Sequence, residues 1–340
     1  MGSDCSLSRG YGGTPKKILV TGASGYLGQF IVDALLARKA KENLTISGAT
    51  HSISPKEAVP FGVKGVKMDG SDLKSVKSVL KSVKPDIIIN TMALSSPAVC
   101  EKKKELAENL NSAKALVDAV KSIVPQALVI HISTDQVYSG VSPDGPYTNK
   151  SSTIPINAYG KTKLMAEENL RQLEDYLILR SSGIYGPPPP RQCSKKGTFL
   201  QMTEGLLKKP EKSPFFSEEK RSHIYVRDVV KAVLYFVFNY DASLYAEQAS
   251  FERIYCMGGN GTWSRDKYAE VVAEKLNLKK DSILPMTRAE CKQKWAHTFK
   301  SPADITMESS RLYTILGKPC VPLSEGIEDM IKRQEILKVP

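Results

Sequence analysis

The sequence lacks any long uninterrupted hydrophobic run. Although 41% of its 340 residues are hydrophobic, no window approaches 18 consecutive apolar residues, and a membrane-spanning helix needs about 20. It also lacks a Cys-x-x-Cys pair, and its six cysteines and four histidines are scattered without metal-ligand spacing. We therefore expect reduced thiols, no metal site, no integral membrane association and a cytoplasmic location.

A concentrated basic block is also missing, although the net charge is +12. Residues 1–180 hold 23 Lys+Arg and 17 Asp+Glu, and residues 181–340 hold 25 and 19, so each half carries +6. Nucleic-acid-binding proteins concentrate such an excess on one tail or face, so we expect no nucleic-acid partner. The densest local excess, eight Lys+Arg against four Glu, lies at residues 191–221, where it would attract phosphorylated ligands.

The first 15 residues have no apolar stretch of the kind found in signal peptides. They are rich in Gly and Ser, which predicts a disordered tail. Gly2 and Ser6 fit the N-myristoylation pattern, and Cys5 offers a second acylation position. Short patterns of this kind often occur by chance, so myristoylation at Gly2 is the less favoured alternative to an unmodified tail.

From Lys16 onward, short apolar segments alternate with amphipathic helical segments. Strands are expected at residues 17–21, 44–49, 86–90, 127–133 and 176–180. Helices are expected at residues 26–38, 74–83, 104–122 and 158–172. This alternation predicts an α/β fold with a Rossmann-type doubly wound parallel sheet. The strands lack polar alternation, which is typical of a sheet covered by helices on both faces.

The pattern changes after Tyr185, where four prolines (187–190) can continue neither a helix nor a central strand. Beyond them we expect a helix at 225–238, a strand at 253–257, and helices at 268–276, 288–299 and 325–337. We therefore predict two interleaved units. The Rossmann domain comprises residues 16–186 and about 222–258, and a smaller C-terminal substrate-binding domain comprises about 187–221 and 259–340.

A glycine-rich segment, residues 21–28 (TGASGYLG), joins the first strand to the first helix. Glycine permits the tight turn and the close approach of a pyrophosphate, and the following helix presents free N–H groups to the phosphates. The order of strand, glycines and helix therefore predicts a dinucleotide site. The expected contacts are Gly22, Ser24, Gly25, Tyr26, Leu27 and Gly28.

The end of the second strand indicates which dinucleotide is bound. An acidic residue there would bind the ribose 2′-hydroxyl of NAD and repel the 2′-phosphate of NADP. Residues 48–54 (GATHSIS) contain no acid; they include His51, and Lys56 follows closely. We therefore predict NADP(H) as the preferred cofactor, with NAD(H) as the alternative. Asp69 and Gly70 follow the third strand, which places Asp69 to meet the adenine.

Tyr159 and Lys163 share one face of a predicted helix, because they are spaced i, i+4. About 25 residues earlier, Ser133 and Thr134 end a strand at the sheet edge where α/β proteins bind ligands. A phenol has a pKa near 10, and a neighbouring ammonium lowers that pKa. The combination of Tyr159 and Lys163 with the two strand-end hydroxyls therefore predicts a site for acid–base chemistry, not a solvated pair on the surface.

These motifs resemble those of the extended short-chain dehydrogenase/reductases. Within that superfamily, the chain is similar both to dTDP-4-dehydrorhamnose reductases and to regulatory β subunits of methionine adenosyltransferase. The matching segments are VTGASGYLGQ (20–29), KPDIIINTMA (84–93), HISTDQVYSG (131–140), INAYGKTKLMAEE (156–168) and LRSSGIYG (179–186). A weaker match extends the resemblance to about residue 337.

The resemblance implies roles for individual residues. Tyr159 would protonate a carbonyl oxygen as hydride arrives, and Lys163 would lower the pKa of Tyr159 and hold the nicotinamide ribose. Thr134 would hydrogen-bond the substrate oxygen, with Ser133 as the fallback. Further cofactor contacts would come from Thr91, Met92, Ala93, Ser133, Tyr159, Lys163 and Ser182.

Substrate contacts are implied for Thr134, Gln136 and Arg221. Arg221 matches an arginine that binds diphosphate in the superfamily. Gln136 stands where related dehydratases carry a glutamate, and a neutral amide cannot replace that acid, so dehydration is not expected. The arginine that relatives carry before Pro302 is absent, because Ser301 stands there. This change makes a nucleotide-sugar substrate less strongly implied for this chain.

Two functions agree with these motifs and with the resemblance. The first is an NADPH-dependent carbonyl reductase acting on a 4-keto-6-deoxy nucleotide sugar, such as dTDP-4-dehydrorhamnose, or on another small carbonyl metabolite. The alternative is a non-catalytic NADP-binding regulatory subunit that docks on a methionine adenosyltransferase catalytic subunit. A homodimer formed through residues 104–122 and 158–172 is a further expectation from the resemblance.

Overall fold

A parallel sheet of seven strands organises the computed structural model, which describes residues 14–141, 145–191, 197–245, 250–294 and 300–336. The strand order is β11 (Ile254–Met257), β6 (Tyr176–Ser181), β5 (Leu128–Thr134), β4 (Ile87–Asn90), β1 (Lys16–Thr21), β2 (Leu44–Thr50) and β3 (Lys64–Lys67). The chain builds outward from β1 to β3, then returns to β4 and builds in the opposite direction. The predicted doubly wound Rossmann-type sheet is confirmed, and its switch point lies between β1 and β4.

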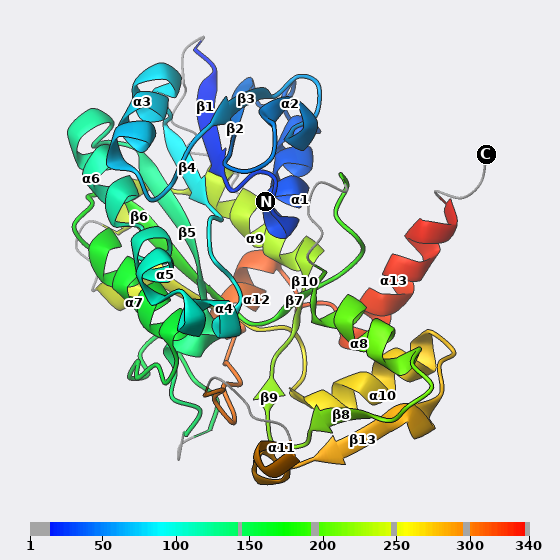
Figure 1. The fold of residues 1–340 in the computed structure, drawn as a ribbon. Helices are drawn as coiled ribbons and strands as arrows, with labels where there is room; N and C mark the ends of the chain where they lie inside the picture. The colour runs from blue at the N-terminus through cyan, green and yellow to red at the C-terminus, as the bar shows by residue number, and fades with distance from the viewer. Residues whose placement is uncertain (1–13, 142–144, 192–196, 246–249, 295–299, 337–340) are drawn as a thin grey trace, which may run out of the picture.

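Helices cover both faces of this sheet (Figure 1). One layer contains α1 (Tyr26–Leu36), α9 (Val226–Asn239) and α12 (Ser310–Leu316), and the other contains α3 (Leu73–Val83), α6 (Lys114–Ile123) and α7 (Ala158–Leu170). Along β1, Ile18 and Val20 pack into the first layer, whereas Leu19 packs into the second. Because both faces are buried along the central strands, successive apolar residues there pack into opposite layers.

The predicted single helix at residues 104–122 was wrong. The structure has α5 (Lys104–Asn111) and α6, and Ala113 between them adopts a left-handed φ of 53°. A left-handed residue ends a right-handed helix. The buried amide of Asn111 accepts a hydrogen bond from Leu94 N (2.7 Å) and donates to Thr162 Oγ1 (3.1 Å), so its role is structural. A further helix, α4 (Pro97–Lys102), was not predicted.

A smaller group of elements gathers beyond the carboxyl edge of the sheet (Figure 1). Its strands β8 (Ser213–Phe216) and β13 (Ile283–Met286) pair in parallel. Its helices are α8 (Phe199–Leu207), α10 (Arg265–Lys275), α11 (Arg288–Lys294) and α13 (Leu323–Ile336). The sequence pattern missed α8, which begins with a capping box between Thr198 and Gln201.

Short elements connect the two groups. The strand pairs are β9 (Lys220–Arg221) with β12 (Trp263–Ser264), and β7 (Ile184–Tyr185) with β10 (Ile224–Tyr225). The remaining short helices are α2 (Pro55–Ala58), η1 (Asp135–Val137), η2 (Ala242–Leu244), η3 (Ser250–Arg253) and η4 (Lys280–Ser282).

Within the described residues, no helix is both long and apolar enough to cross a bilayer. No group of His, Cys, Asp and Glu side chains in these same ranges is placed to hold a metal ion. The acylation positions Gly2 and Cys5 lie outside the described residues.

Candidate active site

A cleft of about 560 Å³ lies at the carboxyl edge of the sheet, where β1, β4, β5 and β6 end. It brings together most of the predicted site residues, although they come from separate parts of the chain. Those that line it are Gly25, Tyr26, Leu27, Gly28, Thr91, Ala93, Ser133, Thr134, Gln136, Tyr159, Ser182 and Arg221. Gly22, Ser24, His51, Asp69, Gly70, Met92 and Lys163 are not among its lining residues.

The glycine loop is closed too tightly to accept side chains. Gly22 has a φ of 69°, and its carbonyl accepts a hydrogen bond from Gly25 N (2.8 Å). A Cβ on Gly28 would lie 2.2 Å from Gly22 O. Gly25 precedes α1 without a side-chain cap, so backbone N–H groups at the helix start face the cleft unobstructed. This arrangement fits the approach of a phosphate group.

His51, Asp69, Gly70 and Met92 lie just beyond the ends of β2, β3 and β4. His51 is exposed, and its Nε2 lies 3.6 Å from Asp69 Oδ2. Hydrogen bonds from Ser71 hold the pKa of the Asp69 carboxyl below its ordinary value. A Cβ on Gly70 would meet Met92 Sδ at 2.7 Å, so these two residues pack closely.

The start of α7 places Tyr159 beside Thr134. Asn157 caps this helix by accepting a hydrogen bond from Gly160 N (2.8 Å). A Cβ on Gly160 would lie 2.1 Å from Gln136 O, so α7 packs directly against the chain after β5. Burial raises the pKa of Tyr159, the Asp135 carboxylate raises it further, and the Thr134 hydroxyl acts in the opposite direction.

The two predicted strand-end hydroxyls have different partners. Ser133 Oγ donates to the buried Glu167 carboxylate at 2.6 Å, within the ion pair between Glu167 and Arg180. Thr134 Oγ1 donates to Asp135 Oδ1 (3.1 Å), and Ser182 Oγ donates to Asp135 Oδ2 (2.8 Å). Thr134 is therefore the hydroxyl that contacts the Tyr159 phenol, while its role toward a substrate oxygen, with Ser133 as the fallback, stays a prediction.

Lys163 is buried behind the cleft wall, in a chain of polar contacts that reaches β1. Its Nζ lies 2.7 Å from Ile132 O and 2.8 Å from His131 Nε2. His131 Nδ1 in turn lies 2.9 Å from Asn90 Nδ2. Asn90 Oδ1 accepts from the Thr21 hydroxyl (2.7 Å) and from Met92 N (3.3 Å).

These contacts assign the protons along the chain. The N–H of Met92 requires an oxygen as its acceptor, which turns the Asn90 amide nitrogen toward His131 Nδ1. Burial lowers the pKa of His131 well below its usual value, and the neighbouring Lys163 lowers it further, so the ring carries one proton. His131 Nδ1 therefore accepts from the Asn90 amide, and Nε2 faces Lys163 Nζ at 2.8 Å.

The expected lowering of the Tyr159 pKa by Lys163 stays a prediction, and burial acts against it at both residues. Burial lowers the pKa of Lys163 to about 7, against the opposing charge of Glu167. The charged form is disfavoured because water is excluded from the amine. The pKa of Tyr159 is raised rather than lowered.

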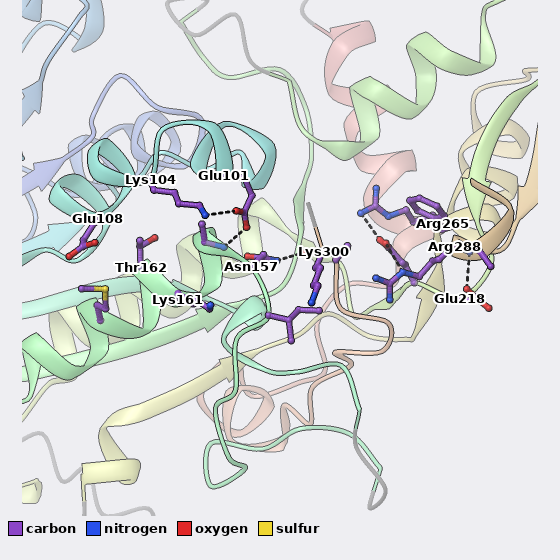
Figure 2. A pocket seen from close by; sticks show the side chains of 17 residues that line it. Glu101, Lys104, Glu108, Asn157, Lys161, Thr162, Glu218, Arg265, Arg288 and Lys300 are labelled. Carbon is purple, nitrogen blue, oxygen red and sulfur yellow. Dashed lines mark hydrogen bonds and ion pairs between the residues drawn. The ribbon is translucent and has the colours of Figure 1, made fainter. Parts of the chain in front are cut away.

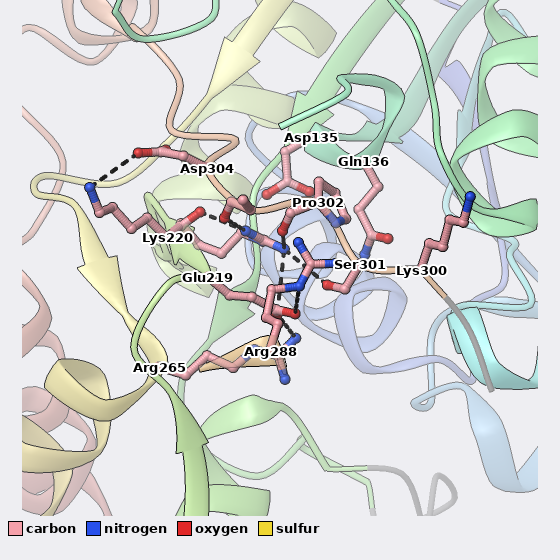
Figure 3. Close-up of polar contacts among 12 residues, drawn as sticks. Asp135, Gln136, Glu219, Lys220, Arg265, Arg288, Lys300, Ser301, Pro302 and Asp304 are labelled. Atoms are coloured by element: carbon pink, nitrogen blue, oxygen red, sulfur yellow. Dashed lines mark hydrogen bonds and ion pairs between the residues drawn. The ribbon is translucent and has the colours of Figure 1, made fainter. Parts of the chain in front are cut away.

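Arg221 lines the cleft and contacts neighbouring protein oxygens, and its role in binding a diphosphate stays a prediction. Its Nη1 donates to Lys220 O (2.7 Å) and Ala303 O (2.9 Å), and its Nη2 donates to Pro302 O (2.9 Å) and Ser301 Oγ (3.3 Å). Only 7% of the residue is exposed. These contacts join β9 to the segment at residues 301–304, and Figure 3 labels Lys220 on β9 and Ser301, Pro302 and Asp304 on that segment. Arg221 thus clamps two chain segments together.

Three cations of residues 191–221 form ion pairs with acidic residues that do not line the cleft. Arg191 pairs with Asp33 (2.7 Å), Lys208 with Glu204 (2.5 Å) and Lys220 with Asp304 (3.5 Å). Arg221 and Arg265 line the cleft itself, and Arg288 and Lys300 line a larger cavity beside it. The sequence contained no local pattern that marked Arg265 or Arg288, because the starts of α10 and α11 reach the site only through tertiary packing.

A second cavity of about 1120 Å³ adjoins this region. Figure 2 shows α4, α5 and the start of α7 on one side, and Arg265 and Arg288 on the other. Asn157 lies at its floor, where Nδ2 donates to Gln136 Oε1 (2.9 Å) and Lys300 O (3.0 Å). Arg265 lines both this cavity and the cleft, so the two spaces meet at that residue.

The fold and the site together define an extended short-chain dehydrogenase/reductase. Residues 16–336 match the family model described as "RmlD substrate binding domain", and the chain belongs to this family.

Curated relatives align with this chain over different fractions of its length. It is 28% identical to the spore coat polysaccharide biosynthesis protein SpsK of Bacillus subtilis (strain 168), over 81% of this chain and 84% of the relative. It is 26% identical to methionine adenosyltransferase 2 subunit beta of Danio rerio, over 93% and 90%. It is 36% identical to dTDP-4-dehydrorhamnose reductase of Salmonella typhimurium, over 34% and 39%.

A solved structure shows the same fold. The dTDP-4-dehydrorhamnose reductase of Bacillus anthracis strain Ames, crystallised in complex with NADP, superposes with a TM-score of 0.71 at 21% identity. The match covers 94% of this chain and all of that one.

Proposed function

We propose that this protein is an NADPH-dependent carbonyl reductase that acts on a nucleotide-linked keto sugar of the 4-keto-6-deoxy type. The observation that carries this proposal is the single cleft that holds the glycine loop, the Thr134 hydroxyl and the Tyr159 phenol. Membership of the RmlD family supports the class of reaction. The name of the Salmonella relative, dTDP-4-dehydrorhamnose reductase, supports the class of substrate.

The residues of the cleft fit a nicotinamide dinucleotide. The turn at Gly22 and the close approach of Gly28 leave backbone alone where a pyrophosphate would lie. The end of β2 presents His51 and no carboxylate of its own, which favours NADP(H) over NAD(H). The NADP complex of the Bacillus anthracis reductase supports the same preference. When bound, NADPH supplies the hydride.

Tyr159 serves as the acid in this proposal. The Thr134 hydroxyl and the Tyr159 phenol hold the substrate oxygen, and the phenol gives its proton to that oxygen as the carbonyl carbon receives the hydride. The raised pKa of Tyr159, caused by burial, keeps the phenol protonated before the reaction. The phenolate left on Tyr159 takes up a proton from water that enters the cleft, which restores the phenol before the next turnover.

The decisive experiment measures NADPH oxidation against dTDP-4-dehydrorhamnose and a panel of other nucleotide keto sugars and small ketones. Tyr159→Phe removes the proton but preserves the ring, so kcat is expected to fall at least 100-fold while the Kd for NADPH changes less than threefold. Tyr147→Phe, another buried tyrosine, is the matched control. Normal turnover by Tyr159→Phe would show that another group is the acid.

A second candidate function is regulation of a methionine adenosyltransferase. The observation that favours it is coverage: the Danio rerio β subunit aligns along 93% of this chain, whereas the Salmonella reductase aligns along 34%. Under this proposal the chain binds NADP(H) and docks on a catalytic subunit. A pull-down with that subunit, followed by assay of its kinetics, tests it. The absence of both a complex and a kinetic effect would remove this candidate.

A further inference from the structure

Glu219 is the centre of an unusual group of charges beside the cleft. Its side chain is 1% exposed. Its carboxylate oxygens lie 2.7 Å from Arg265 Nη2, 3.7 Å from Arg221 Nη2 and 3.8 Å from Arg288 Nε. Figure 3 shows the guanidinium groups converging on this one carboxylate. A buried carboxylate is costly unless cations compensate it, and here it also draws together cations that would otherwise repel one another.

The three arginines are not equivalent. Arg221 directs four N–H contacts at protein oxygens and is nearly buried. The side chains of Arg265 and Arg288 are 29% and 34% exposed. Both Glu219 oxygens lack a partner with hydrogen-bond geometry among the described residues, so the attraction is ionic. N–H groups of Arg265 and Arg288 therefore remain able to donate to a ligand.

The position of Arg265 is held by aromatic rings. Its guanidinium carbon lies 5.2 Å from the centre of the Phe199 ring and 5.5 Å from that of Phe216. A guanidinium stacked in this way loses little further freedom when it binds an anion. It faces both the cleft that contains Tyr159 and the larger cavity, which Arg288 also lines.

The charge balance favours an anionic ligand. Three guanidinium groups surround the Glu219 carboxylate, and the charged residues that line the larger cavity have a net charge of +1: Lys104, Lys161, Arg265, Arg288 and Lys300 against Glu101, Glu108, Glu218 and Glu219. Paired guanidinium forks match the oxygens of phosphate groups. Both arginines lie on the smaller group of elements, whereas the acid–base groups lie at the sheet edge. A ligand that reaches from Tyr159 to Arg265 therefore carries its anion away from its reacting carbon.

We propose that Arg265 and Arg288, drawn together by Glu219, bind the diphosphate of the substrate, and that Arg221 acts as a structural clamp. This inference rests on the proposed function, because it names the part of the site that recognises a nucleotide-linked substrate. It also explains how the chain binds such a substrate although Ser301 replaces an arginine of its relatives.

The test is equilibrium binding, measured by calorimetry with thymidine diphosphate and with thymidine as probes. Arg265→Gln and Arg288→Gln are each expected to weaken thymidine diphosphate binding at least tenfold, and to leave the Kd for NADPH within threefold. Lys267→Gln removes a charge from the exposed face of the same helix α10 and is the matched control, with diphosphate affinity within twofold of wild type. Thermal unfolding of each variant verifies that it is folded.

Two results would overturn the anion site. One is diphosphate affinity that is unchanged in both arginine variants, and the other is a wild-type chain that binds thymidine diphosphate no better than thymidine. A folded Arg221→Gln variant that alone loses the diphosphate would assign the site to Arg221 instead. If diphosphate binding depends on Arg265 and Arg288 but no ketone is reduced, the anion site stands and the proposed reductase activity fails.

Discussion

Burial determines the protonation of Tyr159 and Lys163, which are spaced i, i+4 on helix α7. Burial raises the pKa of Tyr159 and lowers the pKa of Lys163 to about 7. Above pH 7 the phenol therefore keeps its proton while the amine has lost one. A group that protonates a carbonyl must carry its proton at the start, so this resting state suits the direction of reduction.

Lys163→Met is expected to remove a pH dependence of stability. Because the folded-state pKa of about 7 lies below the model value of 10.5, the unfolded chain binds more protons between these values, and the stability of the wild type rises with pH. The contribution of a fully buried amine over this range is about 4 kcal/mol. Urea unfolding at pH 7, 8.5 and 10 measures it.

Lys161→Met, an exposed change on the same helix, is the control and is expected to keep the rise. The difference between wild type and Lys163→Met isolates this amine from other groups that titrate in the same range. An identical pH profile for the two would contradict the assignment of a neutral Lys163.

At the scale of elements, helix ends determine where the loops that bear the site begin. Asp72 caps the start of helix α3, and its side chain accepts from Lys74 N and Ser75 N. It ends at Lys84, whose left-handed φ of 48° turns the chain into β4. Strand β4 follows, and its last residue, Asn90, belongs to the polar contacts that lead through His131 to Lys163. A left-handed conformation is unfavourable for lysine, which has a Cβ.

Lys84→Gly is expected to stabilise the protein by about 0.5 to 1 kcal/mol. Glycine adopts the left-handed conformation without steric cost, although it also gives the unfolded chain more freedom. Lys81→Gly, in the last turn of the same helix, is the control, and it should destabilise by about 1 kcal/mol because its backbone is helical. Urea unfolding measures both. Destabilisation of similar size in both variants would show that the backbone at Lys84 carries no strain.

At the scale of the whole molecule, the cleft unites segments that are far apart in the chain. The residues that line it range from Gly25, just before α1, to Arg265, the first residue of α10. Such a cleft exists only in the folded state, so a dinucleotide that fills it stabilises that state by mass action. Binding of the cofactor can therefore be followed through global stability, without any turnover.

NADPH is expected to raise the melting temperature more than NADH at equal concentration. At 100 times its Kd, a ligand adds about 2.7 kcal/mol of stability, which corresponds to roughly 5 °C for a chain of this size. In Lys56→Gln, which removes the cation near the predicted 2′-phosphate position, the shift with NADPH should fall toward that with NADH. Differential scanning fluorimetry measures these shifts. A larger shift with NADH would reverse the predicted cofactor preference.

Much of the fold and part of the site follow from patterns between near neighbours. Apolar runs, helical spacing and the glycine turn predicted the sheet, the loop at residues 21–28 and the shared face of Tyr159 and Lys163. Each of these features depends on residues within a few positions of one another. The break at Ala113 and the helix α8 were missed, because a left-handed alanine and a short capped helix carry weak local signals.

The sequence by itself determined the sheet, the dinucleotide loop and the residues that converge at the edge, but the tertiary structure decided what their charges do. Lys163 meets His131 across 32 positions, and Arg221 meets Pro302 across 81. Arg265 and Arg288 reach Glu219 only because α10 and α11 pack beside β9. Buried charged groups take the partners that the packed chain places within hydrogen-bond or ion-pair distance. No periodicity along the sequence encodes those partners, so the roles of Lys163, Arg221 and Arg265 emerged only in three dimensions.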